Sequence, residues 1–272
     1  MSHPVLPPSP MPLSDAEFEE LLRRVERALV RVRSDADRFF HQVERSLVII
    51  VGPPRDAVMS GMHRLADLLE RLLDEVSKIL TNPGVPWRVS NAAESWSTEV
   101  GARVSALVAR VMSDSLKADN RWEGPAAEAY KDALDRQKEA LAAIKPITDG
   151  IDAALSGASG AIWALWGAVV AALLSLIVAI GTGIIAAMSV VGTPAAVAAV
   201  ISGAIAAIGL VTAAVTAFVT FVGSTQTAVS QLRQQLTANQ GFDGDHRSRH
   251  WPVSDTPAFA DGHISGQKWK IK

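Results

Sequence analysis

One short stretch near the end of the chain gathers residue types that could bind a metal ion. Its members are Asp243, Asp245, His246 and His250. Two histidines four residues apart share a face only on a helix, and Gly241, Gly244 and Pro252 around them disfavour a helix. We therefore interpret this stretch as part of a solvated polar tail and predict no metal site.

No other group of residues has the spacing of a catalytic or nucleotide-binding site. The chain has no cysteine, which excludes thiol nucleophiles and Cys-ligated zinc. The Gly-Pro-Pro-Arg turn at 52–55 lacks the lysine and the Ser or Thr of a phosphate-binding loop. Most carboxylates stand beside arginines in helical patterns, which is typical of solvated ion pairs. We therefore predict a protein that is not an enzyme and has no cofactor.

Charge is distributed very unevenly along the 272 residues. The formal net charge is −2, which argues against nucleic acid as a partner, because that partner requires a basic face. Residues 1–152 are rich in both signs, whereas 153–232 contain no Asp, Glu, Lys or Arg. A charge-free stretch of this length is typical of membrane segments. The sequence thus predicts a charged helical part followed by a membrane-type part.

The charged part has the pattern of long amphipathic helices. Apolar residues recur at every third or fourth position over 18–47, 58–80, 90–116 and 125–151. Proline and glycine separate the first three segments, and β-type alternation is absent. We expect an all-α fold in which two antiparallel helical hairpins pack like a four-helix bundle.

The membrane-type part consists of two apolar segments, 161–191 and 195–222, separated by Gly192-Thr193-Pro194. Each segment exceeds the roughly 20 residues that cross a bilayer, so we expect a hairpin that turns at Gly192 and Pro194. Four aromatic residues would meet at its open end and form a membrane-interface belt. They are Trp163, Trp166, Phe218 and Phe221.

The composition of this apolar hairpin is compatible with more than one environment. It is rich in Ala and Gly, whose small faces favour close helix packing inside a bilayer. The same faces suit a hairpin that amphipathic helices sheathe and later release, or packing in a purely soluble protein. If it spans a membrane twice, the basic residues on its flanks, including Lys145 and Arg233, place both chain ends in the cytoplasm.

Residues 120–130 read Asn-Arg-Trp-Glu-Gly-Pro-Ala-Ala-Glu-Ala-Tyr and lie between two of the predicted helices. Trp122-Glu123-Gly124, followed by Pro-Ala-Ala and Tyr130, resembles the WxG (Esx-like) family of helical hairpins handled by type VII secretion in actinobacteria and firmicutes. The resemblance covers about 88–158. Gly124 suits the chain reversal because it has no Cβ, and Trp122 either offers a partner an aromatic surface or only seals its own hairpin. Tyr130 is either a contact residue or a packing residue.

The resemblance implies a role in protein recognition, with Trp122, Gly124 and Tyr130 at the partner-binding surface. The implied partners are another WxG-type hairpin protein or a second copy of this chain, the secretion machinery and the lipid bilayer. We expect a component or substrate of a type VII (Esx-like) pathway, located in the cell membrane or exported without a Sec signal peptide. The alternative is a membrane-active, pore-forming-like effector or toxin delivery module.

These observations predict five parts along the chain. They are a disordered arm over 1–13, helical hairpins over 14–86 and 87–158, the apolar hairpin over 159–232 and a flexible polar tail over 233–272.

Overall fold

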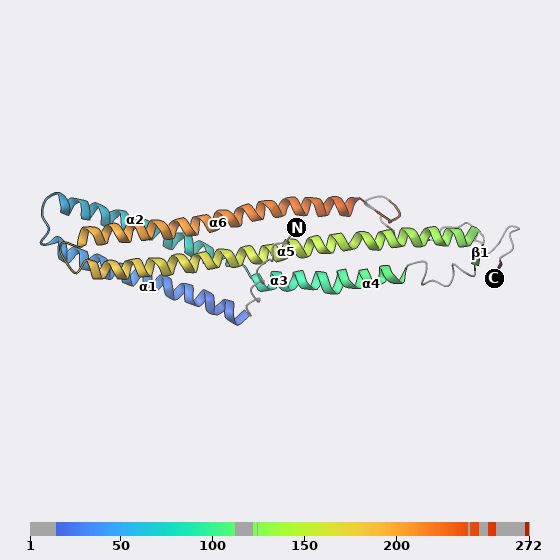
Figure 1. Ribbon diagram of the computed structural model, residues 1–272, viewed down its shortest axis with the longest axis horizontal. Helices are drawn as coiled ribbons and strands as arrows, with labels where there is room; N and C mark the ends of the chain where they lie inside the picture. The colour runs from blue at the N-terminus through green and yellow to red at the C-terminus, as the bar shows by residue number, and fades with distance from the viewer. Residues whose placement is uncertain are drawn as a thin grey trace, which may run out of the picture. The chain divides into compact units, whose positions relative to one another are not determined.

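The computed structural model of the chain describes residues 15–111, 122–123, 125–238, 240–244, 250–253 and 270–271. These residues are almost entirely helical, which confirms the all-α prediction (Figure 1). They fall into two compact units. The first contains the described residues of Met1–Arg88 together with Ala158–Val222, and the second contains those of Val89–Gly157 and Gly223–Lys272.

The elements follow one another along the chain as long helices with short connections. They are α1 (Asp15–Leu47), α2 (Pro53–Thr81), α3 (Pro86–Ser95), the π-helix η1 (Trp96–Ala102), α4 (Arg103–Arg110), β1 (Trp122–Glu123), α5 (Pro125–Ala186), α6 (Thr193–Thr237) and β2 (Lys270–Ile271). Among the described residues, β structure is limited to the antiparallel pair β1–β2 and an isolated bridge between Asp243 and His250.

Helices α1 and α2, together called the sheath below, each bury the apolar face that the sequence predicts. The buried residues include Phe18, Val25, Val32, Phe39 and Val43 on α1 and Val58, Leu65, Leu72 and Val76 on α2. Gly52, with φ of +72°, makes the turn between the two helices, a conformation that favours glycine. Pro53 then begins α2, where its missing N–H costs nothing.

The outer face of α1 is covered by ion pairs. Arg27 Nη2 lies 2.6 Å from Glu20 Oε1, and Arg24 Nε lies 3.3 Å from the same oxygen. Hydrogen bonds from Arg27 and then Arg24 hold the pKa of the Glu20 carboxyl below its ordinary value. This face is therefore strongly hydrated and charged.

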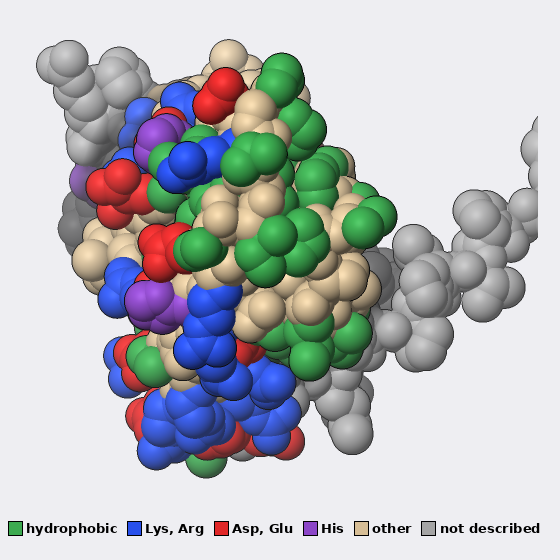
Figure 2. Space-filling view, turned by 90° about the vertical axis from the view of Figure 1, so that its left-hand side faces the viewer, with side chains coloured by type: hydrophobic (Ala, Val, Ile, Leu, Met, Phe, Trp, Pro, Cys, Tyr) green, Lys and Arg blue, Asp and Glu red, His purple; other side chains and the backbone are tan. Residues whose placement is uncertain are grey.

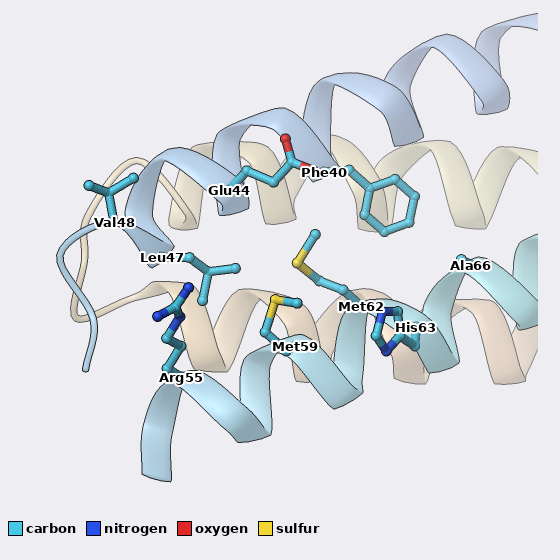
Figure 3. A pocket seen from close by; sticks show the side chains of 9 residues that line it. All are labelled: Phe40, Glu44, Leu47, Val48, Arg55, Met59, Met62, His63 and Ala66. Atoms are coloured by element: carbon cyan, nitrogen blue, oxygen red, sulfur yellow. The ribbon is translucent and has the colours of Figure 1, made fainter. Parts of the chain in front are cut away.

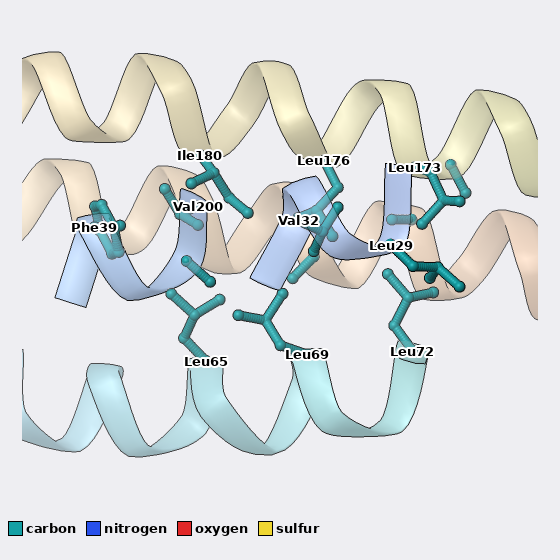
Figure 4. Packing of buried hydrophobic residues seen from close by; sticks show 14 of the residues in the cluster. Leu29, Val32, Phe39, Leu65, Leu69, Leu72, Leu173, Leu176, Ile180 and Val200 are labelled. Carbon is teal, nitrogen blue, oxygen red and sulfur yellow. The ribbon is translucent and has the colours of Figure 1, made fainter. Parts of the chain in front are cut away.

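The sheath packs against the two arms of the apolar hairpin, residues 161–186 of α5 and 193–222 of α6. Figure 4 shows Leu65 and Leu72 of α2 facing Leu176 and Ile180 of α5 and Val200 of α6. Each such side chain contributes about 1.5–3 kcal/mol when it is fully buried. Sequence periodicity favoured pairing of 14–86 with 87–158, but it identifies only a face and not what packs on it. The structure has the sheathed arrangement, which was one of the arrangements left open.

The two helices that form the apolar hairpin extend beyond its predicted boundaries at 159 and 232. Helix α5 continues without interruption through Gly157 and Gly160, and α6 continues past Val222 to Thr237. Glycine lowers helix stability by about 1 kcal/mol per residue, which is too little to stop a helix of this length. Pro146 also lies inside α5.

The second unit pairs residues 89–110, which run through α3, η1 and α4, with the part of α5 at 125–157. A Cβ built on Gly101 of η1 would lie 2.9 Å from Thr148 Oγ1 of α5, so the two helices approach closely. The end of α6 approaches α5 in the same way, since a Cβ on Gly150 would lie 2.7 Å from Leu232 Cδ2. The predicted helix over 90–116 is confirmed as far as Arg110, and its last residues lie outside the described part of the chain.

Candidate functional site

At the open end of the apolar hairpin, two of the four residues of the predicted aromatic belt pack in the hydrophobic core. Trp166 is fully buried, and Trp163 packs beside it on the same helix. The ring of Phe18 stands edge-on to both indoles, with centroids 5.4 Å from Trp163 and 6.1 Å from Trp166, and it also contacts Trp87. In this structure the two indoles thus bind the sheath. Phe218 and Phe221 lie half-buried on α6.

Hydrogen bonds reinforce this aromatic cluster. Trp166 Nε1–H donates to the carbonyl of Pro83 at 2.8 Å, and Ser159 Oγ–H donates to the carbonyl of Pro86 at 2.9 Å. Gly84 (φ +68°) lets the connection between α2 and α3 approach Ile162 closely. We name these contacts of residues 83–86 with Ser159, Ile162 and Trp166 the latch. Phe18 belongs to the apolar stripe that the sequence predicts, but its place in an aromatic cluster was not predicted. Trp87, which precedes the predicted helix over 90–116, was missed.

At the closed end, the hairpin turns between Ala186 and Thr193. A Cβ on Gly192 would lie within 2.6 Å of both Ala186 O and Ser189 Oγ, so only glycine fits there. The backbone N–H of Gly192 donates to Ser189 Oγ, and Thr193 Oγ1–H donates to the carbonyl of Ser189, both at 3.0 Å. Pro194 stands in the first turn of α6, where proline is compatible with a helix.

The closed end is also tied to α1. The buried carbonyl of Ala187 accepts hydrogen bonds from Ser46 Oγ–H at 3.2 Å and from Gln42 Nε2 at 3.4 Å. Nearby, a groove of about 530 Å³ lies between α1 and α2 (Figure 3). Phe40, Met59 and Met62 give it an apolar lining, and Glu44 and Arg55 add charges.

The sheath covers the arms on one side only. Leu174, Val178 and Ile185 of α5 share one helix face and are 55%, 67% and 71% exposed, and Ile205 and Leu210 of α6 are each 44% exposed. Viewed at the closed end, hydrophobic side chains gather on one side and charged side chains on the other (Figure 2). By length and composition, α5 and α6 each contain a segment apolar enough to cross a membrane.

Polar side chains on the arms are satisfied by their own helix. The hydroxyls of Ser175, Thr182, Ser202 and Thr220 each donate to a backbone carbonyl three or four residues earlier, at 2.9–3.0 Å. Such a bond removes the need for water at the hydroxyl. Nothing in the hydrogen bonding of these four side chains therefore opposes an apolar environment.

Of the predicted recognition turn at 122–124, the structure describes only the backbone of Trp122 and Glu123. Trp122 and Glu123 form β1, which pairs with β2 in the register Trp122 with Ile271 and Glu123 with Lys270. Gly124 and the side chain of Trp122 lie outside the described residues. Tyr130 lies half-buried on α5, which begins directly after the tripeptide.

The stretch considered as a metal site is partly held against α5. The backbones of Asp243 and His250 exchange two hydrogen bonds, and the carboxylate of Asp243 pairs with Arg136 of α5. Gln137 Nε2 donates to the carbonyl of Pro252 at 2.7 Å. No group of His, Asp and Glu side chains in the described part of the chain could hold a metal ion. Asp245 and His246 lie outside that part.

No family model, curated protein or solved structure matches this chain. The main feature of the candidate site is an uncharged hairpin that amphipathic helices cover on one side.

Proposed function

We propose that this protein acts on membranes by inserting its apolar hairpin into a lipid bilayer. The observation that carries the proposal is the one-sided covering of the arms. The sheath supplies charge and hydration on its outer face, whereas the opposite face of the arms presents Leu174, Val178 and Ile185 to solvent. An exposed apolar face of this kind marks a surface with a further partner.

A bilayer suits this face better than water does. Each arm is long enough to cross the hydrocarbon core, and residues 153–232 carry no formal charge. A spanning segment must satisfy its backbone internally, which both helical arms do. On insertion, the contacts of the arms with the apolar face of the sheath are replaced by contacts with lipid. The sheath helices then lie at the membrane interface, where long amphipathic helices are stable.

The direction of insertion follows from the charges on the flanks. Asp149 and Asp152 precede the first arm, and Arg233 follows the second. Crossing of the open end would carry these charges through the bilayer, at a cost of several kcal/mol. The closed end crosses instead, and both flanks stay on the side of entry. If insertion occurs from inside the cell, both ends of the chain remain cytoplasmic, as the positive-inside rule favours.

A disulfide lock tests the proposal, because the native chain has no cysteine. A Cβ on Gly61 of α2 would lie 2.7 Å from Val197 Cγ1 of α6, so Gly61→Cys with Val197→Cys places two thiols within bonding reach. The oxidised protein is expected to lose leakage activity on phosphatidylcholine vesicles, since the sheath cannot leave the arms. Reduction is expected to restore that activity.

The matched control is Val197→Cys alone, which cannot form the bridge and is expected to behave alike under both conditions. Equal leakage by the oxidised and reduced double variant would contradict release of the sheath. Absence of leakage and of vesicle binding by the wild-type protein would contradict the proposal as a whole.

A second proposed function concerns the second unit. We propose that 88–158 is recognised by another WxG-type hairpin protein, or by a second copy of this chain, within a type VII (Esx-like) pathway. The observation that favours it is the close packing of the helices on either side of the tripeptide, seen at Gly101 and Thr148. Trp122, Gly124 and Tyr130 would form the contact surface.

Cell fractionation tests this second function. Native cells that produce the wild-type chain or Trp122→Ala are separated into cytosol, membrane and medium. The substitution is expected to lower the amount in the medium, or in the membrane if the protein stays with the apparatus. Trp251→Ala is the control, because it removes an exposed tryptophan of the same unit. An unchanged distribution would leave Trp122 with a packing role.

A further inference from the structure

Two connecting loops at the closed end of the first unit are unusually apolar. Residues 48–51 follow α1 and read Val-Ile-Ile-Val, and residues 188–191 follow α5 and read Met-Ser-Val-Val. Neither loop contains a charged residue. The most exposed side chains are Val48 at 83%, Ile49 at 67%, Val51 at 77%, Met188 at 73% and Val191 at 92%. Surface loops usually carry polar residues and glycine, so this composition needs an explanation.

The two loops form one surface, which we name the tip. They lie at the same end of the first unit (Figure 1). Ser46 and Gln42, in the last turns of α1, both donate to the carbonyl of Ala187 beside the second loop. Ser46 and Ala187 are buried, so this link holds the loops together. Large exposed side chains gathered in this way exceed the single apolar residues that are normal on a protein surface.

We propose that the tip is the surface through which this protein first docks on a lipid bilayer. This inference rests on the proposed insertion of the hairpin and adds to it the loop between α1 and α2, which belongs to the sheath. The closed end is the part of the hairpin that must enter first, because the open end is continuous with charged helix. Val48, Ile49 and Val51 stand beside it and enlarge the apolar surface that reaches the membrane.

The internal hydrogen bonding of the second loop fits a lipid environment. Ser189 Oγ accepts from the N–H of Gly192 and donates to the carbonyl of Ala186, and Thr193 Oγ1–H is bonded to Ser189 O. These polar groups therefore need no partner from outside. A protein partner usually provides polar contacts around an apolar centre, whereas the tip offers few polar groups for such contacts.

Charges near the tip give no preference for an anionic surface. Arg45 and Arg55 are the nearest basic residues along the chain, and they are balanced by Glu44 and Asp56. Docking should therefore depend on the apolar side chains and be nearly equal on neutral and anionic lipid. This expectation distinguishes the tip from a basic patch, whose affinity rises with the fraction of anionic lipid.

The experiment compares three full-length variants by flotation with vesicles of phosphatidylcholine, and with vesicles that also contain phosphatidylglycerol. Val48→Asp and Val191→Asp place one charge in each loop of the tip. Val30→Asp is the matched control, because Val30 is 66% exposed on α1 away from the tip. We expect both tip variants to lower the vesicle-bound fraction on the order of tenfold, and the control to bind like the wild type. Circular dichroism checks that all three remain helical.

Val48→Asp is the decisive variant, because Val48 lies outside the hairpin. If it binds vesicles like the wild type while the wild-type hairpin still causes leakage, the tip inference fails and the proposed function stands. If the wild type binds neither kind of vesicle, both fail. Loss of a dimer in light scattering with unchanged vesicle binding would mean that the tip joins two copies, and it would also overturn the inference.

Discussion

Trp166 links the sheath to the hairpin through its apolar ring and through its indole N–H. Its ring is completely buried against Phe18, and its N–H is bonded to the carbonyl of Pro83. A buried indole needs such an acceptor, so the position of 83–86 is fixed by the first arm. The latch therefore stabilises the sheathed state at the end opposite the tip.

Trp166→Phe tests the latch. The substitution keeps most of the apolar volume but leaves the Pro83 carbonyl without its donor, which is expected to lower the free energy of unfolding by about 1–3 kcal/mol. Because the sheath is held less firmly, vesicle leakage should begin at a lower protein concentration. Urea denaturation and leakage assays measure the two effects. Trp251→Phe, at an exposed position of the second unit, is the control, and equal stability of both variants would contradict a role for the latch.

Two glycines of the apolar hairpin should respond in opposite directions to alanine. At Gly192 the added Cβ would meet Ala186 O at 2.5 Å, whereas at Gly209 it would meet nothing within 4 Å. Gly192→Ala is expected to destabilise the protein by about 1–3 kcal/mol through overcrowding. Gly209→Ala is expected to stabilise it by about 0.5–1 kcal/mol, because alanine favours a helix. Thermal unfolding compares them, and a stable Gly192→Ala variant would show that the turn can rearrange.

At the scale of elements, hydrophobic periodicity predicted which faces are buried. The stripe from Phe18 to Val43 on α1 is buried as expected, since an amphipathic helix must cover its apolar face. The break at Gly192 was also predicted, because proline and glycine interrupt helical patterns. What packs on each stripe could not be predicted, since every apolar face offers the same kind of surface. Only the packing of the sheath on the arms assigns these stripes their partner.

Short and irregular contacts gave no signal in the sequence. Pairing of Trp122–Glu123 with Lys270–Ile271 involves two residues on each side, which is too short for a periodic pattern. The ion pair of Arg136 with Asp243 joins residues far apart in sequence. For the candidate site, the hairpin and its turn were predicted, whereas the latch and the link at Ala187 depend on single hydrogen bonds that no spacing rule reveals.

Arg136→Ala tests the contact of Asp243 with α5. Both side chains of the ion pair remain partly exposed, so its loss should change the free energy of unfolding by no more than about 1 kcal/mol. Local opening should increase, and limited proteolysis near Asp243 is expected to become faster. Lys138→Ala, at an exposed position of the same helix, is the control. Equal cleavage rates in the two variants would mean that the ion pair does not hold this segment.

At the scale of the whole molecule, charge divides the chain into parts with different preferred surroundings. The sheath carries charges on one face and apolar residues on the other, a pattern that is compatible both with its packing over the arms and with the membrane interface of the proposed function. The arms carry no charge and are helical throughout, so they need only an apolar environment. Under the proposed function, the arms would exchange the sheath for lipid while their helices stay unchanged.

This exchange predicts a distinct pattern of amide hydrogen exchange when vesicles are added. Exposed amides of the arms, around Val178 and Ile205, should become more protected because lipid excludes water from them. Amides of α1 and α2 should lose protection, because the packing against the arms that opposes their local opening is gone. The described helical residues of the second unit at 89–110 and 125–157 provide an internal reference. If the arms gained protection while α1 and α2 kept theirs, the first unit would be docking as a whole with its sheath in place, and release of the hairpin would be excluded.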